Sequence, residues 1–397
     1  GRVVGEMAFV DESPRAADVR AVEDCTVRHW PRTVLLKMLE GDVGLSARFY
    51  TALSRAAVSR LRATDKLAAG VVHARSLGVA SELSAAAAVE ARALASAPRA
   101  AWAAAEDALR GGTQVESLDI DEVLSALVEA VDVWLSGVTS VSRAQNAGAV
   151  LRSELRHWLL RSQTGHIAVE RREEQGGRLS FLAHLLLNRA QGTDVLGEHI
   201  DGAILALPTP RGLRQRLMVA VDEVGNALPT DRPANITLIQ PACGALLARM
   251  LPRVVAQGAT IQCVDSDAQT LAFVDTGLQA LPANVSLEMV HQDLVDLSEN
   301  RVTQTHGPAD LIVLNGLVDH LPSGLISSLL LGCAAQLAEG GRMVLTAMAP
   351  ATDARFMEHL LGWPLMRRTA EELVALVSAA GLEARVSMPD SGQAGCG

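Results

Sequence analysis

Three residues at the ends of expected strands could together hold a nucleoside. Gly244 follows the apolar run 236–239 and precedes a helical pattern, so the backbone of this turn can approach a ligand closely. Asp265 ends the next run, 21 residues after Gly244, which is near the spacing at which a carboxylate reaches ribose hydroxyls. Asp293 follows the run 285–290, where an acid can accept from an adenine amino group. Together they predict a cofactor with an adenosyl ribose.

The turn before the first expected helix indicates which cofactor this is. A dinucleotide fingerprint has three glycines, because a pyrophosphate must rest on the helix N-terminus. This turn has Ala242, Cys243 and then a single glycine, Gly244. A cofactor without phosphates tolerates that loss better, so we expect S-adenosylmethionine. The backbone around Ala242, Cys243 and Gly244 would hold its methionine end, Asp265 the ribose and Asp293 the adenine.

Asp265 has a second interpretation as the N-cap of the helix expected from residue 268, for which Asp267 is the better candidate.

The three proposed cofactor-binding residues can meet only if strands and helices alternate along the chain. Little-interrupted apolar runs indicate strands that are covered on both faces. The pattern predicts a helix stop and turn at Gly340-Gly341 and strands at 236–239, up to Asp265, at 285–290, 309–315, 342–345 and 385–388. The expected fold class is α/β, a doubly wound parallel sheet with its site at the carboxyl ends of the strands.

Several short motifs resemble those of class I S-adenosylmethionine-dependent methyltransferases. They are PACG, CVDSDAQTLAF, QDL, DLIVLNGLVDHLP, LAEGGRMVLTAM and GWPLMRRTAEEL, which together cover residues 233–382. Within that class the chain looks like a bacterial group for biosynthesis of an extracellular factor, 3-hydroxypalmitic acid methyl ester. The resemblance implies a Rossmann-like methyltransferase domain and a small-molecule or lipid acceptor, for example a fatty-acid carboxylate.

The resemblance also assigns roles to the residues after the fourth expected strand, where methyl acceptors bind in such enzymes. Asn315, Asp319 and His320 cluster there and are the candidate catalytic residues. His320 could act as a general base near neutral pH, and the alternative is a solvated loop histidine. A carboxylate acceptor would need no base, because it is already ionised.

The first residues of the chain resemble the phosphate-binding cassette of cyclic nucleotide-binding domains, through the segments GEMA and PRAA. The resemblance implies that Arg15 binds the cyclic phosphate of cAMP or cGMP, while Glu6 accepts from the ribose 2′-hydroxyl. Asp18 stands where many such cassettes have Thr or Ser, and an anion beside the phosphate weakens binding. The expected cyclic nucleotide contacts are Gly5, Glu6, Arg15 and Ala16.

The organisation of the chain follows from these two resemblances. Residues 1–75 would form the C-terminal half of a cyclic nucleotide-binding β-roll with its closing helix, and residues 76–117 an Ala-rich helical linker. Residues 118–228 would form a helical region, and residues 229–397 a methyltransferase domain without its last strand. The closing helix forms dimers in related modules, so the resemblance also implies a homodimer.

Bulk composition argues against several classes of protein. A formal net charge of −10 disfavours a general nucleic-acid surface, which needs clustered cations. The five cysteines are widely spaced and form no CxxC pair, which indicates neither a disulfide framework nor a zinc site. No apolar run long enough for a membrane span occurs, and no signal peptide. We expect a cytoplasmic protein with no metal and no nucleic-acid partner.

Two classes of function remain open. The first is a methyltransferase, in which the protein aligns the acceptor with an already activated methyl group. The second is a regulatory binding protein that responds to a cyclic nucleotide and has lost catalysis. The single-glycine turn favours the second class. So does the segment 169–177, VERREEQGG, because the related group has a basic loop of the form KPRGYAGD there. The retained acids, Asp265 and Asp293, favour the first.

Overall fold

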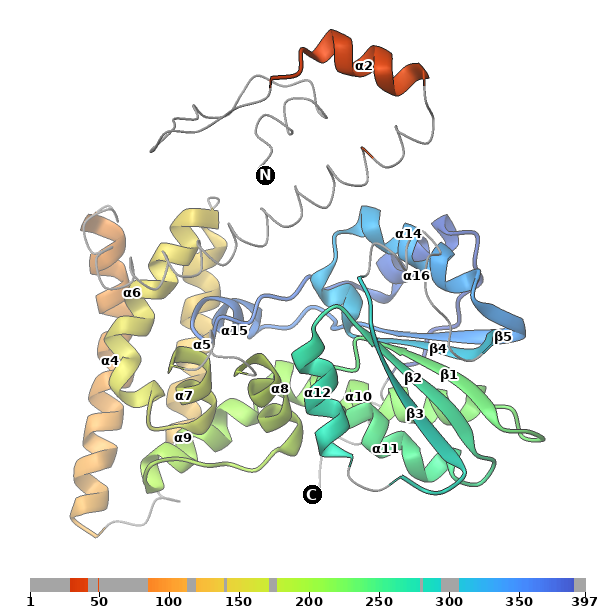
Figure 1. The fold of residues 1–397 in the computed structure, drawn as a ribbon. Helices are drawn as coiled ribbons and strands as arrows, with labels where there is room; N and C mark the ends of the chain where they lie inside the picture. Colours follow the sequence, from red (N-terminus) through yellow and green to blue (C-terminus); the bar gives the residue numbers. More distant parts are fainter. Residues whose placement is uncertain are drawn as a thin grey trace. The chain divides into compact units, whose positions relative to one another are not determined.

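The structure is a computed structural model that describes residues 29–41, 49, 85–112, 119–138, 141–170, 177–278, 281–293 and 307–388. The chain divides into two compact units, residues 1–81 and 82–397, which are treated separately below. In the first unit, the described part is centred on helix α2 (Arg32–Gly41) (Figure 1). The cassette residues Gly5, Glu6, Arg15 and Ala16 lie outside the described residues, so their roles stay predictions.

The second unit contains a five-stranded parallel sheet. Its strands are β1 (Ala234–Ile239), β2 (Ala259–Asp265), β3 (Val285–His291), β4 (Ala309–Asn315) and β5 (Leu337–Thr346). Their order is β3-β2-β1-β4-β5, and every neighbouring pair is parallel. The order therefore reverses between β1 and β4, which is where ligands bind in sheets of this kind. The predicted α/β class with a doubly wound parallel sheet is confirmed.

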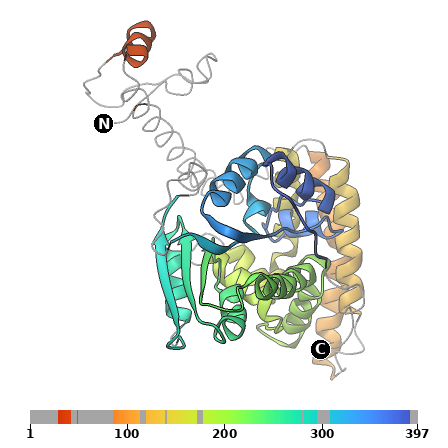
Figure 2. The ribbon, with the colours of Figure 1, turned by 90° about the vertical axis from the view of Figure 1, so that its right-hand side faces the viewer.

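Helices cover both faces of this sheet (Figures 1 and 2). They are α10 (Pro208–Ala227), α11 (Ala245–Val254), α12 (Ala268–Gly277), α14 (Ser323–Ala334) and α16 (Ala370–Ala379). Side chains alternate between the two faces along a strand. Accordingly, Leu238 packs in a core with α10, α11 and α12, whereas Ile239 packs in a second core with α14. Because both faces are covered, nearly every residue of β1, β2 and β4 is buried.

Two strand predictions need correction. β5 begins at Leu337, before the expected turn, and a register shift opposite β4 accommodates the extra residues. Gly340 adopts a φ of 75°, so the two glycines form an irregularity inside the strand and not a turn ahead of it. Residues 385–388 form no strand. Instead, the side chains of Arg385 and Ser387 bond to Glu223 on α10, at 2.5 and 2.8 Å.

A helical layer precedes the sheet and has its own core. Its elements are α4 (Ala85–Arg110), α5 (Ile120–Ser136), α6 (Val141–Leu159), α7 (Gln163–Glu170), α8 (Gly177–Leu187) and α9 (Val195–Leu205), joined by α15 (Ala354–His359) from beyond β5. Buried Trp102, Leu124 and Leu151 represent this core. Gly137 caps the end of α5, and Pro208 begins α10. The predicted division at residues 117 and 228 stays a prediction.

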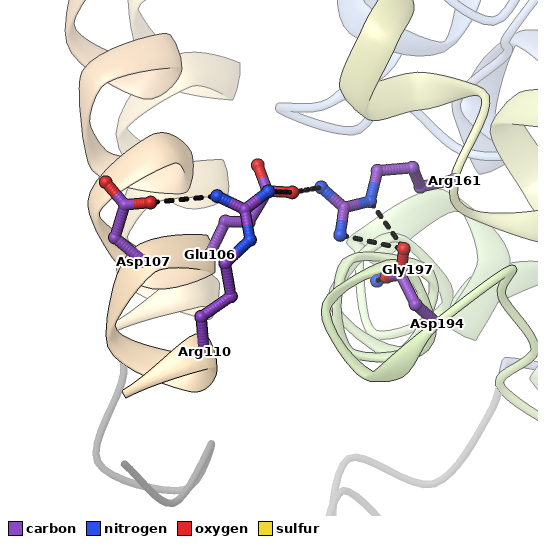
Figure 3. Close-up of polar contacts among 6 residues, drawn as sticks. All are labelled: Glu106, Asp107, Arg110, Arg161, Asp194 and Gly197. Carbon is purple, nitrogen blue, oxygen red and sulfur yellow. Dashed lines mark hydrogen bonds and ion pairs between the residues drawn. The ribbon is translucent and has the colours of Figure 1, made fainter. Parts of the chain in front are cut away.

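One arginine joins three helices of this layer (Figure 3). Arg161 follows α6 and contacts Asp194, the N-cap of α9, at 2.7 Å, and Glu106 on α4 at 3.4 Å. Its guanidinium also lies over the ring of Trp158, 5.4 Å from the centroid. Asp194 in turn accepts from the backbone N–H of Gly197, which caps α9. The Arg161 side chain therefore holds α4 and α9 in place against the end of α6.

A buried carboxylate fixes the start of α10 against the segment after β5. Asp353 is fully buried and accepts from the backbone N–H of Thr209 at 2.8 Å and from its hydroxyl at 2.5 Å. Arg367 donates to the same hydroxyl at 2.6 Å. Because α10 is packed on the sheet along its length, this anchor sets where its side chains lie above the strand ends.

Candidate functional site

The turn between β1 and α11 has an unusual backbone. Gln240, Ala242 and Gly244 have φ values of 53°, 52° and 73°, so every second residue is left-handed. Among described residues other than glycine, a positive φ occurs only at Gln240, Ala242 and Asn188. A side chain in this conformation costs roughly 1 kcal/mol, and such strain persists where the surroundings enforce it, often at functional sites.

Backbone hydrogen bonds hold this turn in place. The N–H of Gln240 donates to Val264 in β2 at 2.8 Å, and the N–H of Gly244 donates to Pro241 at 2.9 Å. Gly244 is the N-cap of α11. Burial raises the pKa of the Cys243 thiol above its usual range, so the thiol is protonated at neutral pH. The three residues predicted to hold the methionine end thus form one rigid turn.

Asp265 ends β2 as predicted, and it is only 5% exposed. Its carboxylate accepts from the backbone N–H of Asp267 at 2.9 Å. Burial raises the pKa of this carboxyl above its ordinary value, because desolvation disfavours the charged form. Asp267 itself caps α12 by accepting from the N–H of Gln269 at 3.0 Å. The expected division of roles, with Asp267 and not Asp265 as the cap, is confirmed.

Asp293 lies immediately beyond β3, two residues after the strand ends at His291. Its neighbour Gln292 donates a backbone hydrogen bond to the carbonyl of Asp265 at 2.9 Å, and β2 pairs with β3 up to Asp265 and His291. The two predicted acids therefore lie on adjacent strand ends. Asp293 is half-buried, so its side chain reaches solvent at this edge.

At the end of β4, Asn315 lies beside the β1–α11 turn. Its side-chain oxygen accepts from the hydroxyl of Thr346 on β5 at 2.9 Å. His320 closes the short 3₁₀ helix η3 (Leu317–His320) and is exposed at its surface. Partial desolvation of the ring and the nearby guanidinium of Arg178 lower the pKa of His320, which therefore favours its neutral form.

Asp319 is the most constrained of the predicted catalytic residues. It is 2% exposed, and one carboxylate oxygen accepts from Arg216 on α10 at 2.5 Å. The other oxygen accepts from the backbone N–H of Met348 at 2.8 Å. Both oxygens are thus occupied within the protein, which favours a positioning role for Asp319 over proton transfer.

A small cleft of about 30 Å³ lies at the reversal point of the sheet. Its floor includes Ala242, Cys243 and Asn315, and its cover comes from α8 and α10. The residues of the cover are Leu182, Leu186, Leu213, Arg216 and Leu217. Sequence reasoning missed them, because they belong to helices far upstream with ordinary amphipathic patterns.

Two kinds of feature are absent from the part of the chain that the structure describes. No three His, Cys, Asp or Glu side chains there are grouped as metal ligands. None of its described helices has the length and apolar composition to cross a bilayer. The cytoplasmic location and the homodimer stay predictions.

Comparison with known proteins gives one family match. The cyclic nucleotide-binding domain family matches residues 1–42, which supports the resemblance of the cassette. A comparison with curated proteins finds no match.

Solved structures with a related arrangement include two methyltransferases. Magnesium protoporphyrin IX methyltransferase from Synechocystis PCC 6803, solved with bound S-adenosylhomocysteine, is 14% identical over 54% of this chain and 90% of its own, with a TM-score of 0.38. The 1,6-didemethyltoxoflavin-N1-methyltransferase from Burkholderia thailandensis is 18% identical over 43% and 66%, with a TM-score of 0.30. A Bordetella parapertussis protein described as possibly exported is 18% identical over 64% and 86%, at 0.46. At these TM-scores the likeness carries no information on the ligand of this chain.

Because the turn is left-handed at Ala242 and Gly244, substitutions at these two positions should change the free energy of unfolding in opposite directions. Ala242→Gly should raise the free energy of unfolding by about 0.5 to 1 kcal/mol, because glycine removes the strain at a φ of 52°. Gly244→Ala should lower it by about 1 kcal/mol. There the added Cβ has room, at 3.6 Å from Val274, so the cost is conformational. Denaturant titration of both variants measures this.

A matched control uses the same chemical change in an ordinary helix. Ala248 is exposed on α11, and Ala248→Gly should lower the free energy of unfolding by about 1 kcal/mol. If Ala242→Gly destabilises as much as Ala248→Gly does, the turn is not strained in solution.

Proposed function

We propose that the chain binds S-adenosylmethionine at the carboxyl edge of its sheet and transfers the methyl group to a small-molecule or lipid acceptor. The observation that carries this proposal is a juxtaposition. The β1–α11 turn, Asp265 and Asp293 end three neighbouring parallel strands, next to a cleft at the reversal point. The motifs that resemble class I methyltransferases cover the same edge and support the proposal.

The donor set of this edge fits a nucleoside without phosphates. Ionised Asp265 has acceptors only, which suits the two hydroxyls of a ribose, and it is buried enough for those bonds to be strong. Asp293 would accept from the adenine amino group. The turn lacks the glycines that a pyrophosphate needs, but its left-handed backbone lets a neutral or zwitterionic group approach. When bound, the cofactor supplies a methyl group on a positively charged sulfur.

The residues beyond β4 would serve the acceptor. His320 is held in its neutral form and could take a proton from a hydroxyl or amine acceptor. Arg178 lies close enough to His320 to lower the pKa of its ring, so this side also favours an anionic acceptor. That charge agrees with the fatty-acid carboxylate that the sequence resemblance implies, for which no base is needed. The main task of the protein is then alignment and exclusion of water.

A regulatory role for the first unit rests on residues 1–42. The match to the cyclic nucleotide-binding family and the presence of both Glu6 and Arg15 in the sequence of the cassette support binding of cAMP or cGMP. A second candidate function follows for the whole chain, namely a cyclic nucleotide-responsive binding protein without catalysis. The side chains at Gln240 and Ala242, where glycine would allow closer approach of a ligand, favour it.

Replacing the ribose-binding acid tests the cofactor proposal. Asp265→Asn should weaken S-adenosylmethionine binding at least tenfold in a calorimetric titration, because it removes charge-assisted hydrogen bonds worth about 1.5–3 kcal/mol. Asp275→Asn makes the same change at an exposed position on α12 and should leave affinity unchanged. A wild-type chain that is folded and binds no cofactor would contradict the proposal.

The affinity for S-adenosylmethionine should also depend on pH, in a direction that the pKa of Asp265 determines. The pKa of Asp265 is raised by burial above its ordinary value of 3.8, and only the ionised form accepts both ribose hydroxyls. Protons therefore compete with the cofactor, so affinity should be constant near neutrality and fall as pH drops through the raised pKa. The residual affinity of Asp265→Asn should not change in that window. Affinity that rises on acidification would exclude the assigned role.

Cyclic nucleotide binding is tested by titrating the chain with cAMP and with cGMP. We expect one of them to bind and Arg15→Ala to abolish binding, because the guanidinium is the main contact to the phosphate. Arg20→Ala removes a nearby arginine of the same segment and should have no effect. If neither nucleotide binds, the regulatory role fails and the methyltransferase proposal stands unaffected.

A further inference from the structure

Arg216 is a cation held in a fixed place above the strand ends. Its Nη1 donates to buried Asp319 at 2.5 Å, and its side chain is 13% exposed. A Cβ built on Gly316 would lie 2.7 Å from Nη2, so the guanidinium rests directly against the backbone that follows β4. Gly316 has a φ of 75°, which brings that backbone into contact with the arginine. The ion pair and the glycine together immobilise the group.

Most of the hydrogen-bonding capacity of this guanidinium is unused. Arginine has five N–H donors, and within the described residues Asp319 engages only Nη1 of Arg216. Arg216 also lines the cleft, together with Ala242, Cys243 and Asn315. It is the single charged residue among those that line it. A largely buried guanidinium with spare donors is suited to a planar anion, which it can bind through two parallel bonds.

The identity of the anion follows from the proposed function, on which this inference rests. The β1–α11 turn lines the same cleft as Arg216, and that turn would hold the methionine end of the cofactor. The methionine end carries a carboxylate, the one anionic group of S-adenosylmethionine. We propose that Arg216 binds this carboxylate and that Asp319 is a positioning residue, which holds the guanidinium over the cleft.

The inference also explains why Asp319 is buried. A lone buried carboxylate would cost far more than one that is paired with an arginine and a backbone N–H. Asp319 balances the charge of Arg216, so the arginine offers the ligand directed hydrogen bonds more than net charge. The competing possibility is that Arg216 binds the carboxylate of an acceptor instead, and the experiment below separates the two.

The test compares two ligands of which only one has the amino-acid end that carries the carboxylate. S-adenosylhomocysteine has the whole methionine-derived end, whereas 5′-methylthioadenosine keeps the adenosine and the sulfur but has no carboxylate. Calorimetric titrations of the full chain with each ligand give two affinities. We expect Arg216→Met to weaken S-adenosylhomocysteine about 10- to 100-fold and to change the affinity for 5′-methylthioadenosine less than about twofold. Arg216→Lys keeps the charge without the fork and should lose less.

Two further variants guard against loss of folding. Arg211 is exposed on the same helix, so Arg211→Met should change neither affinity. Arg216→Met leaves the Asp319 carboxylate unpaired and could unfold the site, in which case both ligands would weaken together. The double variant Arg216→Met/Asp319→Asn removes both charges and keeps an acceptor for Met348. It should reproduce the selective loss of S-adenosylhomocysteine.

Each other outcome overturns the inference. If the double variant binds both ligands as the wild type does, Arg216 does not contact the cofactor, and a role toward the acceptor takes its place. If it weakens both ligands equally, Arg216 supports the site without recognising the carboxylate. If the wild type binds neither ligand, the proposed function fails and the inference fails with it.

Discussion

The buried Asp319 carboxylate connects the parts of the second unit that must meet at the site. The carboxylate accepts from Arg216 on α10 and from the backbone N–H of Met348 after β5. The backbone carbonyl of Asp319 accepts from the N–H of Met366 at 2.7 Å. Arg368 continues this connection by donating to the carbonyls of Val318 and Leu321. Removing one partner would leave a buried charge unpaired, which typically costs about 3–5 kcal/mol. The cover of the cleft and the strand ends below it are therefore held as one structure.

The order of the strands determines which side chains lie on each side of the β1–α11 turn. Because β1 lies between β2 and β4, its turn faces Asp265 on one side and Asn315 on the other. The acids on the β2 and β3 side suit a nucleoside, and the arginine and histidine on the β4 side suit a carboxylate or an acceptor. In the proposed methyl transfer, the reversal of strand order would place the nucleoside of the cofactor and the acceptor on two sides of one turn.

Strand ends could be predicted from the sequence, and side chains from distant segments could not. Apolar runs predicted β1 to β4, and they placed Asp265 at the end of β2 and Asp293 just beyond the end of β3. The left-handed backbone at Gln240 and Ala242 carries no signal, because neither residue is a glycine. Arg216 was missed because its importance depends on a contact 103 residues away. The proposed catalytic role of Asp319 was drawn from its position after β4, and burial was not visible in that pattern.

Hydrogen exchange with and without S-adenosylhomocysteine tests the site as a whole. Binding at the proposed edge should slow exchange in the β1–α11 turn, at residues 240–248, and in the part of α10 around Arg216, while α4 and α9 in the helical layer stay unchanged. The ligand would then bridge the floor and the cover of the cleft. Unchanged exchange at residues 240–248 under saturating ligand, or protection confined to the helical layer, would contradict the placement of a cofactor at this edge.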